Sequence, residues 1–121
     1  MYSINIEKAT LTNKNYRKVL FTSKKQQLVV MSIKAGMDIP LEMHKNGDQF
    51  IRIEKGKGVA RSYIKGKLVK TVKLVDGVSI IIPRGTWHYI KNTGKTPLKL
   101  YSIYSPPQHK DGLIQEEKVV E

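Results

Sequence analysis

The stretch GVSIIIPRGTWHYIKN, residues 77–92, contains the pattern that repeats along this chain. Two short runs, 78–82 and 87–92, are rich in β-branched and aromatic residues and flank the segment PRGT. β-Branched and aromatic side chains favour strands, whereas proline and glycine favour turns. The stretch therefore predicts two β-strands joined by a short connection.

The same alternation of short strands and turns extends along the chain in both directions. Further strands are expected at residues 26–34, 49–54, 58–64, 67–74 and 98–104. Two dipeptides that separate these strands, Lys65-Gly66 and Asp76-Gly77, have the composition of tight turns. Many short strands at this spacing predict an all-β sandwich or barrel, with room for a turn of helix within residues 7–23.

The chain length of 121 residues predicts a single domain, 1–121, with a core barrel at about 26–104 and a tail at 105–121. Pro106 and Pro107 end the last strand, so the tail is either an ordered flap across the barrel or a frayed end. The absence of cysteine excludes disulfides. No run of about 20 apolar residues and no secretory-signal pattern is present, and we expect a cytoplasmic location.

The formal net charge of +12 raises the question of a nucleic-acid or membrane partner. Only four of the 22 basic residues are arginines, and the lysines are scattered singly or in pairs. No expected helix carries a basic stripe. The charge distribution therefore predicts a lysine-rich solvated surface, with neither a specific nucleic-acid site nor a membrane partner, and it is compatible with guidance of an anionic small substrate.

Alternation within the strands places polar side chains on the core side. Gln49 shares a strand face with Ile51 and Ile53, and His88 shares one with Ile90. If the isoleucines fill the core, Gln49 and His88 are interior as well.

The stretch LEMHKNGDQF, residues 41–50, adds a carboxylate and an imidazole two residues apart, on one face if extended. The polar groups that can meet at one barrel end are Glu42, His44, Gln49 and His88. Burying a carboxylate and two imidazoles without partners costs several kcal/mol, and a divalent metal removes that cost. One carboxylate and two imidazoles suit Zn, Fe(II), Mn, Ni or Co, and the amide oxygen of Gln49 can fill a fourth position weakly.

The spacing of these residues resembles the two sequence boxes of the cupin superfamily. The first box reads Gly36-x5-Glu42-x-His44-x4-Gln49-x6-Gly56. The second reads Gly77-x5-Pro83-x-Gly85-x2-His88-x3-Asn92. The first box departs from the usual pattern, because Glu42 stands in place of its first histidine and Gln49 in place of its glutamate. The flanking segments look like a group of short cupins sometimes labelled mannose-6-phosphate isomerase-like.

The resemblance implies a double-stranded β-helix, or jelly-roll, barrel with a short N-terminal segment and an irregular C-terminal tail. It also implies one divalent transition metal as cofactor, and the alternative is a metal-free pocket in which hydrogen bonds satisfy Glu42. The residues that match the family's ligand positions are Glu42, His44, Gln49 and His88. Asn92 and Pro83 are expected to be structural.

Three functions are compatible with such a site. The first is a metal-dependent isomerase or lyase acting on a small sugar-like or hydroxy-keto substrate, in which Glu42, a bound water or His109 moves a proton. The second is an Fe(II)-dependent dioxygenase at the same site, and the third is a non-catalytic barrel that binds a small ligand. His109 lies in the tail, where it is either a plain surface histidine or, if the tail folds over the pocket mouth, a catalytic group.

The outward-facing side chains suggest how copies of the chain associate. Phe50, Trp87 and Tyr89 are candidates for an apolar outer face, and we expect a homodimer. Arg52 is expected outside the barrel, and Glu54 is expected to be a surface partner of a lysine.

The scattered lysines generate a direct prediction about nucleic acid. Binding to duplex DNA should be weak and independent of sequence, and salt should abolish it, because only non-specific phosphate contacts are available. Retention on immobilised DNA at increasing salt measures this. Tight binding that survives about 200 mM salt would contradict the absence of a specific site.

Overall fold

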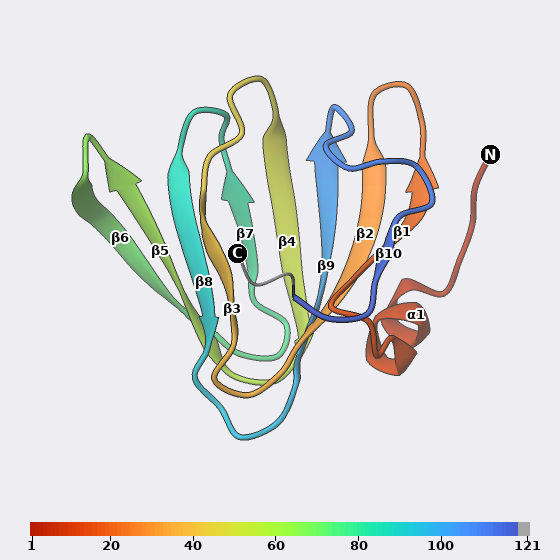
Figure 1. Ribbon diagram of the computed structural model, residues 1–121, viewed down its shortest axis with the longest axis horizontal. Helices are drawn as coiled ribbons and strands as arrows, with labels where there is room; N and C mark the ends of the chain where they lie inside the picture. Colours follow the sequence, from red (N-terminus) through yellow and green to blue (C-terminus); the bar gives the residue numbers. More distant parts are fainter. Residues whose placement is uncertain (119–121) are drawn as a thin grey trace.

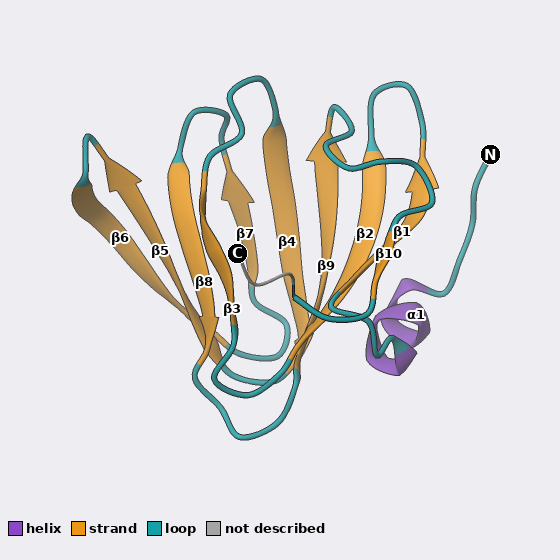
Figure 2. Ribbon diagram, in the orientation of Figure 1, coloured by secondary structure: helices purple, strands orange, loops and turns teal. Residues whose placement is uncertain are grey.

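The computed structural model describes residues 1–118, which form one short helix and ten strands (Figures 1 and 2). The elements are α1 (Ile6–Thr12), β1 (Arg17–Thr22), β2 (Gln27–Ile33), β3 (Asp38–Glu42), β4 (Asp48–Lys55), β5 (Gly58–Ile64), β6 (Lys67–Leu74), β7 (Ser79–Ile82), β8 (Trp87–Asn92), β9 (Leu98–Ser105) and β10 (Ile114–Gln115). Within this part of the chain, no helix has the length and apolar character needed to cross a membrane.

The strands form two antiparallel sheets (Figure 2). The larger sheet has the order β10-β1-β2-β9-β4-β7, and the smaller has the order β3-β8-β5-β6. Strands distant in sequence, such as β2 and β9, therefore lie side by side. The expected all-β jelly-roll barrel is confirmed.

All seven strands expected from the sequence form, each within one residue of its expected ends. Three strands, β1, β3 and β10, were not expected. β1 occupies part of the segment 7–23, in which only the stretch before Asn13 is helical. The helix begins there because the Asn5 side chain accepts a hydrogen bond of 3.0 Å from the backbone N–H of Lys8 and caps its first turn.

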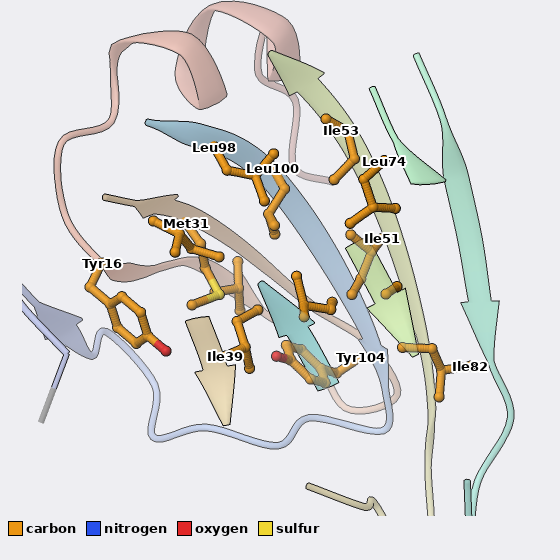
Figure 3. Close-up of a cluster of buried hydrophobic side chains, with 14 of the residues drawn as sticks. Tyr16, Met31, Ile39, Ile51, Ile53, Leu74, Ile82, Leu98, Leu100 and Tyr104 are labelled. Atoms are coloured by element: carbon orange, nitrogen blue, oxygen red, sulfur yellow. The ribbon is translucent and has the colours of Figure 1, made fainter. Parts of the chain in front are cut away.

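The core lies between the sheets and draws apolar side chains from both (Figure 3). Ile51, Ile53 and Leu100 come from the larger sheet, and Ile90 and Leu74 come from the smaller; all five are fully buried. Each such side chain contributes roughly 1.5–3 kcal/mol when buried. The isoleucines of β4 and β8 therefore face inward as expected, which fixes the inward direction of Gln49 and His88.

Asn92, at the end of β8, is a structural hydrogen-bonding centre. Its Nδ2 donates to the backbone oxygens of Ile33 and Thr96 at 2.8 Å each, and its Oδ1 accepts from the N–H of Gly94 at 2.9 Å. One buried amide thus ties β8 to β2 and closes the connection to β9.

The described part of the tail is an ordered flap rather than a frayed end (Figure 1). β10 pairs with β1, and Lys118 forms an ion pair with Asp38 on β3. The last residues of the expected tail, 119–121, lie outside the described residues.

Two expectations about outward-facing residues need correction. Glu54 pairs with Arg52, with 2.7 Å between Oε1 and Nε, rather than with a lysine. Phe50 lies on the outer face of the larger sheet, whereas Trp87 and Tyr89 lie on the outer face of the smaller one, so these aromatic side chains do not form one patch. Arg52 is exposed as expected, and the homodimer stays a prediction.

Replacing Asn92 with alanine should lower the free energy of unfolding by about 2 kcal/mol or more, because buried backbone groups lose their partners. Denaturant titration measures this. Asn46→Ala, at an exposed loop position, is the control and should change stability by less than about 0.5 kcal/mol. Equal effects of the two substitutions would show that the Asn92 hydrogen bonds do not support the fold.

Candidate metal centre

The site begins with an irregularity in the pairing of β3 with β8. Ile39 pairs with Ile90, but Glu42 pairs with His88, so β3 carries one extra residue over this interval. Regular alternation would place Ile39 and Glu42 on opposite faces. The β-bulge between them changes the alternation and puts Glu42 on the same inward face as His88.

His44 lies two residues beyond the end of β3, and the loop that carries it is hydrogen-bonded to the turn between β7 and β8. The N–H of Gly85 donates to the backbone oxygen of His44 at 2.8 Å. Gly85 has φ +78°, a left-handed conformation that favours glycine. The turn between β7 and β8 therefore positions both histidines, one through this backbone bond and the other through the start of β8.

The three side chains converge on one point. Glu42 Oε1 lies 3.3 Å from His44 Nε2 and 3.3 Å from His88 Nε2. One ligand atom from each residue lies within 4.8 Å of the other two. Two imidazoles and a carboxylate at this separation can enclose a single cation.

The tautomer of His88 favours a cation at this point. Its Nδ1 must donate to the backbone oxygen of Thr86 at 3.0 Å, because a carbonyl oxygen can only accept. In a neutral ring Nε2 is then an acceptor, and it faces another acceptor, the carboxylate of Glu42. Such an arrangement is stabilised by a proton or by a metal ion, and histidine ligands of metals commonly donate their other ring N–H to a carbonyl in this way.

The electrostatics of Glu42 favour its charged form. Burial alone would raise the pKa of this carboxyl, but the close approach of the His44 and His88 imidazoles outweighs burial and lowers the pKa to about 2. His44 Nε2 is buried and, despite its 3.3 Å approach to Glu42, has no aligned hydrogen-bond partner in the described chain. The centre thus offers an anion and ring nitrogens free to bind a metal.

Gln49 contributes from the opposite sheet. Its Nε2 donates to the Ser102 hydroxyl at 3.3 Å, and its Oε1 is buried without a hydrogen-bond partner among residues 1–118. A buried carbonyl without a partner costs about 1–3 kcal/mol. Gln49 pairs across the strands with Tyr104, whose ring contacts the ring of His44 at 5.5 Å between centroids. The free amide oxygen therefore lies on the wall next to the cluster.

This donor set fits the expected divalent transition metal. The structure brings Glu42, His44 and His88 within mutual reach and places Gln49 on the neighbouring wall. Carboxylate, imidazole and amide donors together suit Zn, Fe, Mn, Ni or Co.

The flap places His109 beside the centre. Its ring packs edge-on against Tyr104 at 5.0 Å between centroids, and Tyr104 in turn contacts His44. His109 is half-buried, which does not match a plain surface histidine. Its catalytic role stays a prediction.

A buried glutamine that the sequence analysis did not single out holds this part of the flap. Gln27 Oε1 accepts from the N–H groups of Gln108 and His109 at 3.0 and 2.9 Å, and its Nε2 donates to the backbone oxygen of His109 at 2.7 Å. The only sequence signal for this role of Gln27 is its position at the start of an otherwise apolar strand. That signal is weak, because glutamine side chains are usually exposed.

The protonation of His109 follows from this placement. Burial lowers the pKa of its imidazole to about 4, and the positive charge of Arg17 acts in the same direction. The ring is therefore neutral at pH 7. Its Nε2 is buried and has no hydrogen-bond partner within the described residues, so it is free to accept a proton.

Comparison with known proteins gives consistent matches over most of the chain. A family model described as a cupin domain matches residues 29–104. The chain is 46% identical over 118 residues to the uncharacterized protein YrkC of Bacillus subtilis (strain 168), covering 97% of this chain and 63% of YrkC. It is 50% identical over 115 residues to the uncharacterized protein L612 of Acanthamoeba polyphaga mimivirus, covering 94% of this chain and 71% of L612. The chain thus spans less than two thirds of the length of YrkC.

Solved structures show the same fold. The crystal structure of BH2720 from Bacillus halodurans is 44% identical with a TM-score of 0.92, covering 95% of this chain and 88% of that one.

A weaker sequence match, 29% identical over 79 residues, links 65% of this chain to 20% of a probable oxalate decarboxylase of Arthroderma benhamiae.

Replacing Gln27 with methionine should release the flap, because two N–H groups and one carbonyl lose their partner. In NMR titration the pKa of His109 should rise from about 4 toward the ordinary value near 6.5. Since the folded pKa is the lower one, stability conferred by the seated flap should decrease as pH falls through this interval. Gln26→Met, at the exposed neighbouring position, is the matched control. A pKa that is unchanged in Gln27→Met would mean that Gln27 does not hold His109 in place.

Proposed function

Because the chain belongs to the cupin domain family, we propose that it is a metal-dependent enzyme that acts on a small oxygenated substrate in an isomerase- or lyase-type reaction. The observation that carries this proposal is the convergence of Glu42, His44 and His88, whose ligand atoms lie within 4.8 Å of one another. A half-buried carboxylate between two imidazoles has little structural purpose, since three apolar side chains would fill the same space at lower cost.

In this proposal Glu42, His44 and His88 hold the metal, and the free oxygen of Gln49 binds it weakly or orients a ligand. The bound metal supplies Lewis acidity that polarises a substrate carbonyl or hydroxyl. In this proposal the substrate enters through a cleft of about 430 Å³, which His88 lines and which Glu42 and His44 do not line. Its volume suits a small molecule.

His109 is the group proposed to move a proton. Its neutral ring at pH 7 and its buried Nε2 without a hydrogen-bond partner in the described residues leave it able to accept a proton, and its pKa of about 4 makes it a weaker base than an ordinary imidazole. The Tyr104 ring lies 5.0 Å from the ring of His109 and 5.5 Å from that of His44, between ring centroids, so His109 is one side chain away from a candidate metal ligand. Glu42 Oε1 already faces both histidines, which leaves its other oxygen, Oε2, for any catalytic role of this residue.

The similarity to a protein named as a probable oxalate decarboxylase supports a lyase over an isomerase, since decarboxylation is a lyase reaction. One observation favours a second candidate, a non-catalytic binding barrel. Glu42 Oε1 already faces both histidines, so apart from Glu42 Oε2 the proposed site among residues 1–118 offers His109 as its base. A cytoplasmic location and a homodimer are part of the same proposal.

His44→Ala and His88→Ala should abolish retention of metal, whereas Gln49→Ala should reduce it only partly, because an amide is a weak ligand. Metal analysis after dialysis and thermal unfolding with and without Zn²⁺ measure this. Metal present at about 100 times its Kd should stabilise the parent by about 2.7 kcal/mol and the two histidine variants hardly at all.

His109→Ala is the matched control, since it removes the same side chain outside the ligand cluster, and it should retain metal while losing turnover. Equal metal retention by all four variants would show that the metal site is misassigned. Stoichiometric metal with no turnover on hydroxy-keto, oxo-acid or sugar-phosphate substrates would instead support the binding barrel.

A further inference from the structure

One row of the smaller sheet is polar across all four strands. Glu42 on β3 pairs with His88 on β8, His88 pairs with Ser62 on β5, and Ser62 pairs with Lys70 on β6. Directly paired residues of antiparallel strands point to the same face. Because His88 faces inward, the row presents a carboxylate, an imidazole, a hydroxyl and an ammonium group in succession on the inner face.

The neighbouring row is apolar, which makes the polar row distinctive. It consists of the paired residues Ile39, Ile90, Ala60 and Val72. All four are buried or half-buried and belong to the core or pack against it. The change from apolar to polar residues within one step along the strands marks the boundary between the core and the substrate space.

The cleft of about 430 Å³ lies along this polar row. Ser62, Lys70 and His88 line it, and Ile80 and Ile82 of β7 also face it. Among the described residues, its lining contains the cations Lys70 and Arg61 but no carboxylate. The cleft therefore has a positive rim, an apolar side and the candidate metal ligand His88.

Lys70 is available to bind a ligand in this cleft. It is exposed, and no ion pair found within residues 1–118 involves it. Paired side chains in adjacent strands start about 5 Å apart, so Lys70 begins about 10 Å from His88 with Ser62 between them. Arg61 alternates to the outer face, beside Tyr89, and is less suited to point into the cleft.

We propose that the substrate is a small oxo or hydroxy acid with a second carboxylate, and that Lys70, together with the Ser62 hydroxyl, binds this distant carboxylate. This inference rests on the proposed function, in which the oxygenated end of the substrate meets the cluster of Glu42, His44 and His88. A carboxylate matches the site better than a phosphate, because one ammonium and one hydroxyl supply few of the donors that phosphate usually recruits.

A second explanation for Lys70 is that it protects an edge strand from aggregation, since β6 lies at the edge of its sheet. Lys73 on the same strand separates the two explanations. It pairs with Val59 in a row that faces outward, and it is exposed like Lys70. Lys73→Met removes the same charge from the same strand without changing the cleft.

The test is calorimetric titration of 2-oxoadipate and 2-oxohexanoate, with Zn²⁺-loaded and with metal-free protein. The two probes have the same carbon chain, and only the first has a distant carboxylate. The parent and Lys73→Met should bind 2-oxoadipate about tenfold more tightly, a typical effect of one charge-assisted contact at a partly exposed site. Lys70→Met should lose this preference, and Ser62→Ala should reduce it.

Equal affinity of the parent for both probes, no binding of either probe, or the same loss in Lys70→Met and Lys73→Met would overturn the inference. These outcomes are distinct from failure of the proposed function, because metal retention is measured without any organic probe. A protein that retains no metal but still shows the Lys70-dependent preference would contradict the metal-dependent enzyme and leave the carboxylate site intact.

Discussion

The candidate site depends on the pairing of β3 with β8 and on the single extra residue that β3 carries there. Without that bulge, Ile39 and Glu42 would point to opposite faces, and a core-facing isoleucine would send the carboxylate into solvent. With it, one strand delivers both a core side chain and a candidate metal ligand. The cost of burying Glu42 is then offset by two histidines at 3.3 Å.

The two sheets make different contributions to this site. The smaller sheet supplies the polar row that begins at Glu42 and His88, while the larger sheet supplies Gln49 and Tyr104 together with much of the apolar core. The flap completes the arrangement by placing His109 against Tyr104, and Gln27 secures it through three hydrogen bonds. Strands thus hold Glu42, Gln49 and His88, a loop tied to the β7–β8 turn holds His44, and the proton-transfer candidate His109 lies on the flap.

The positive charge of the protein acquires a more specific meaning in this structure. Most lysines lie on solvated faces, as their scattered positions predicted, and the net charge of +12 alone indicates no particular partner. In the cleft beside the polar row, however, Lys70 lies on the inner face and no carboxylate among the described residues that line the cleft balances its charge. The proposed carboxylate site therefore rests on local geometry more than on total charge.

The sequence by itself determined the fold class, seven of the strands and the identity of the four candidate ligands. These follow from short-range rules: β-branched residues alternate with turn residues, and side chains two apart on a strand share a face. The tertiary structure alone decided that β3 is bulged, that β1 joins the larger sheet, that Gln27 fixes the flap and that Lys70 lies in line with His88. Each of these depends on the register between strands that are distant in sequence, and register is set by packing of the whole core, which no local pattern encodes.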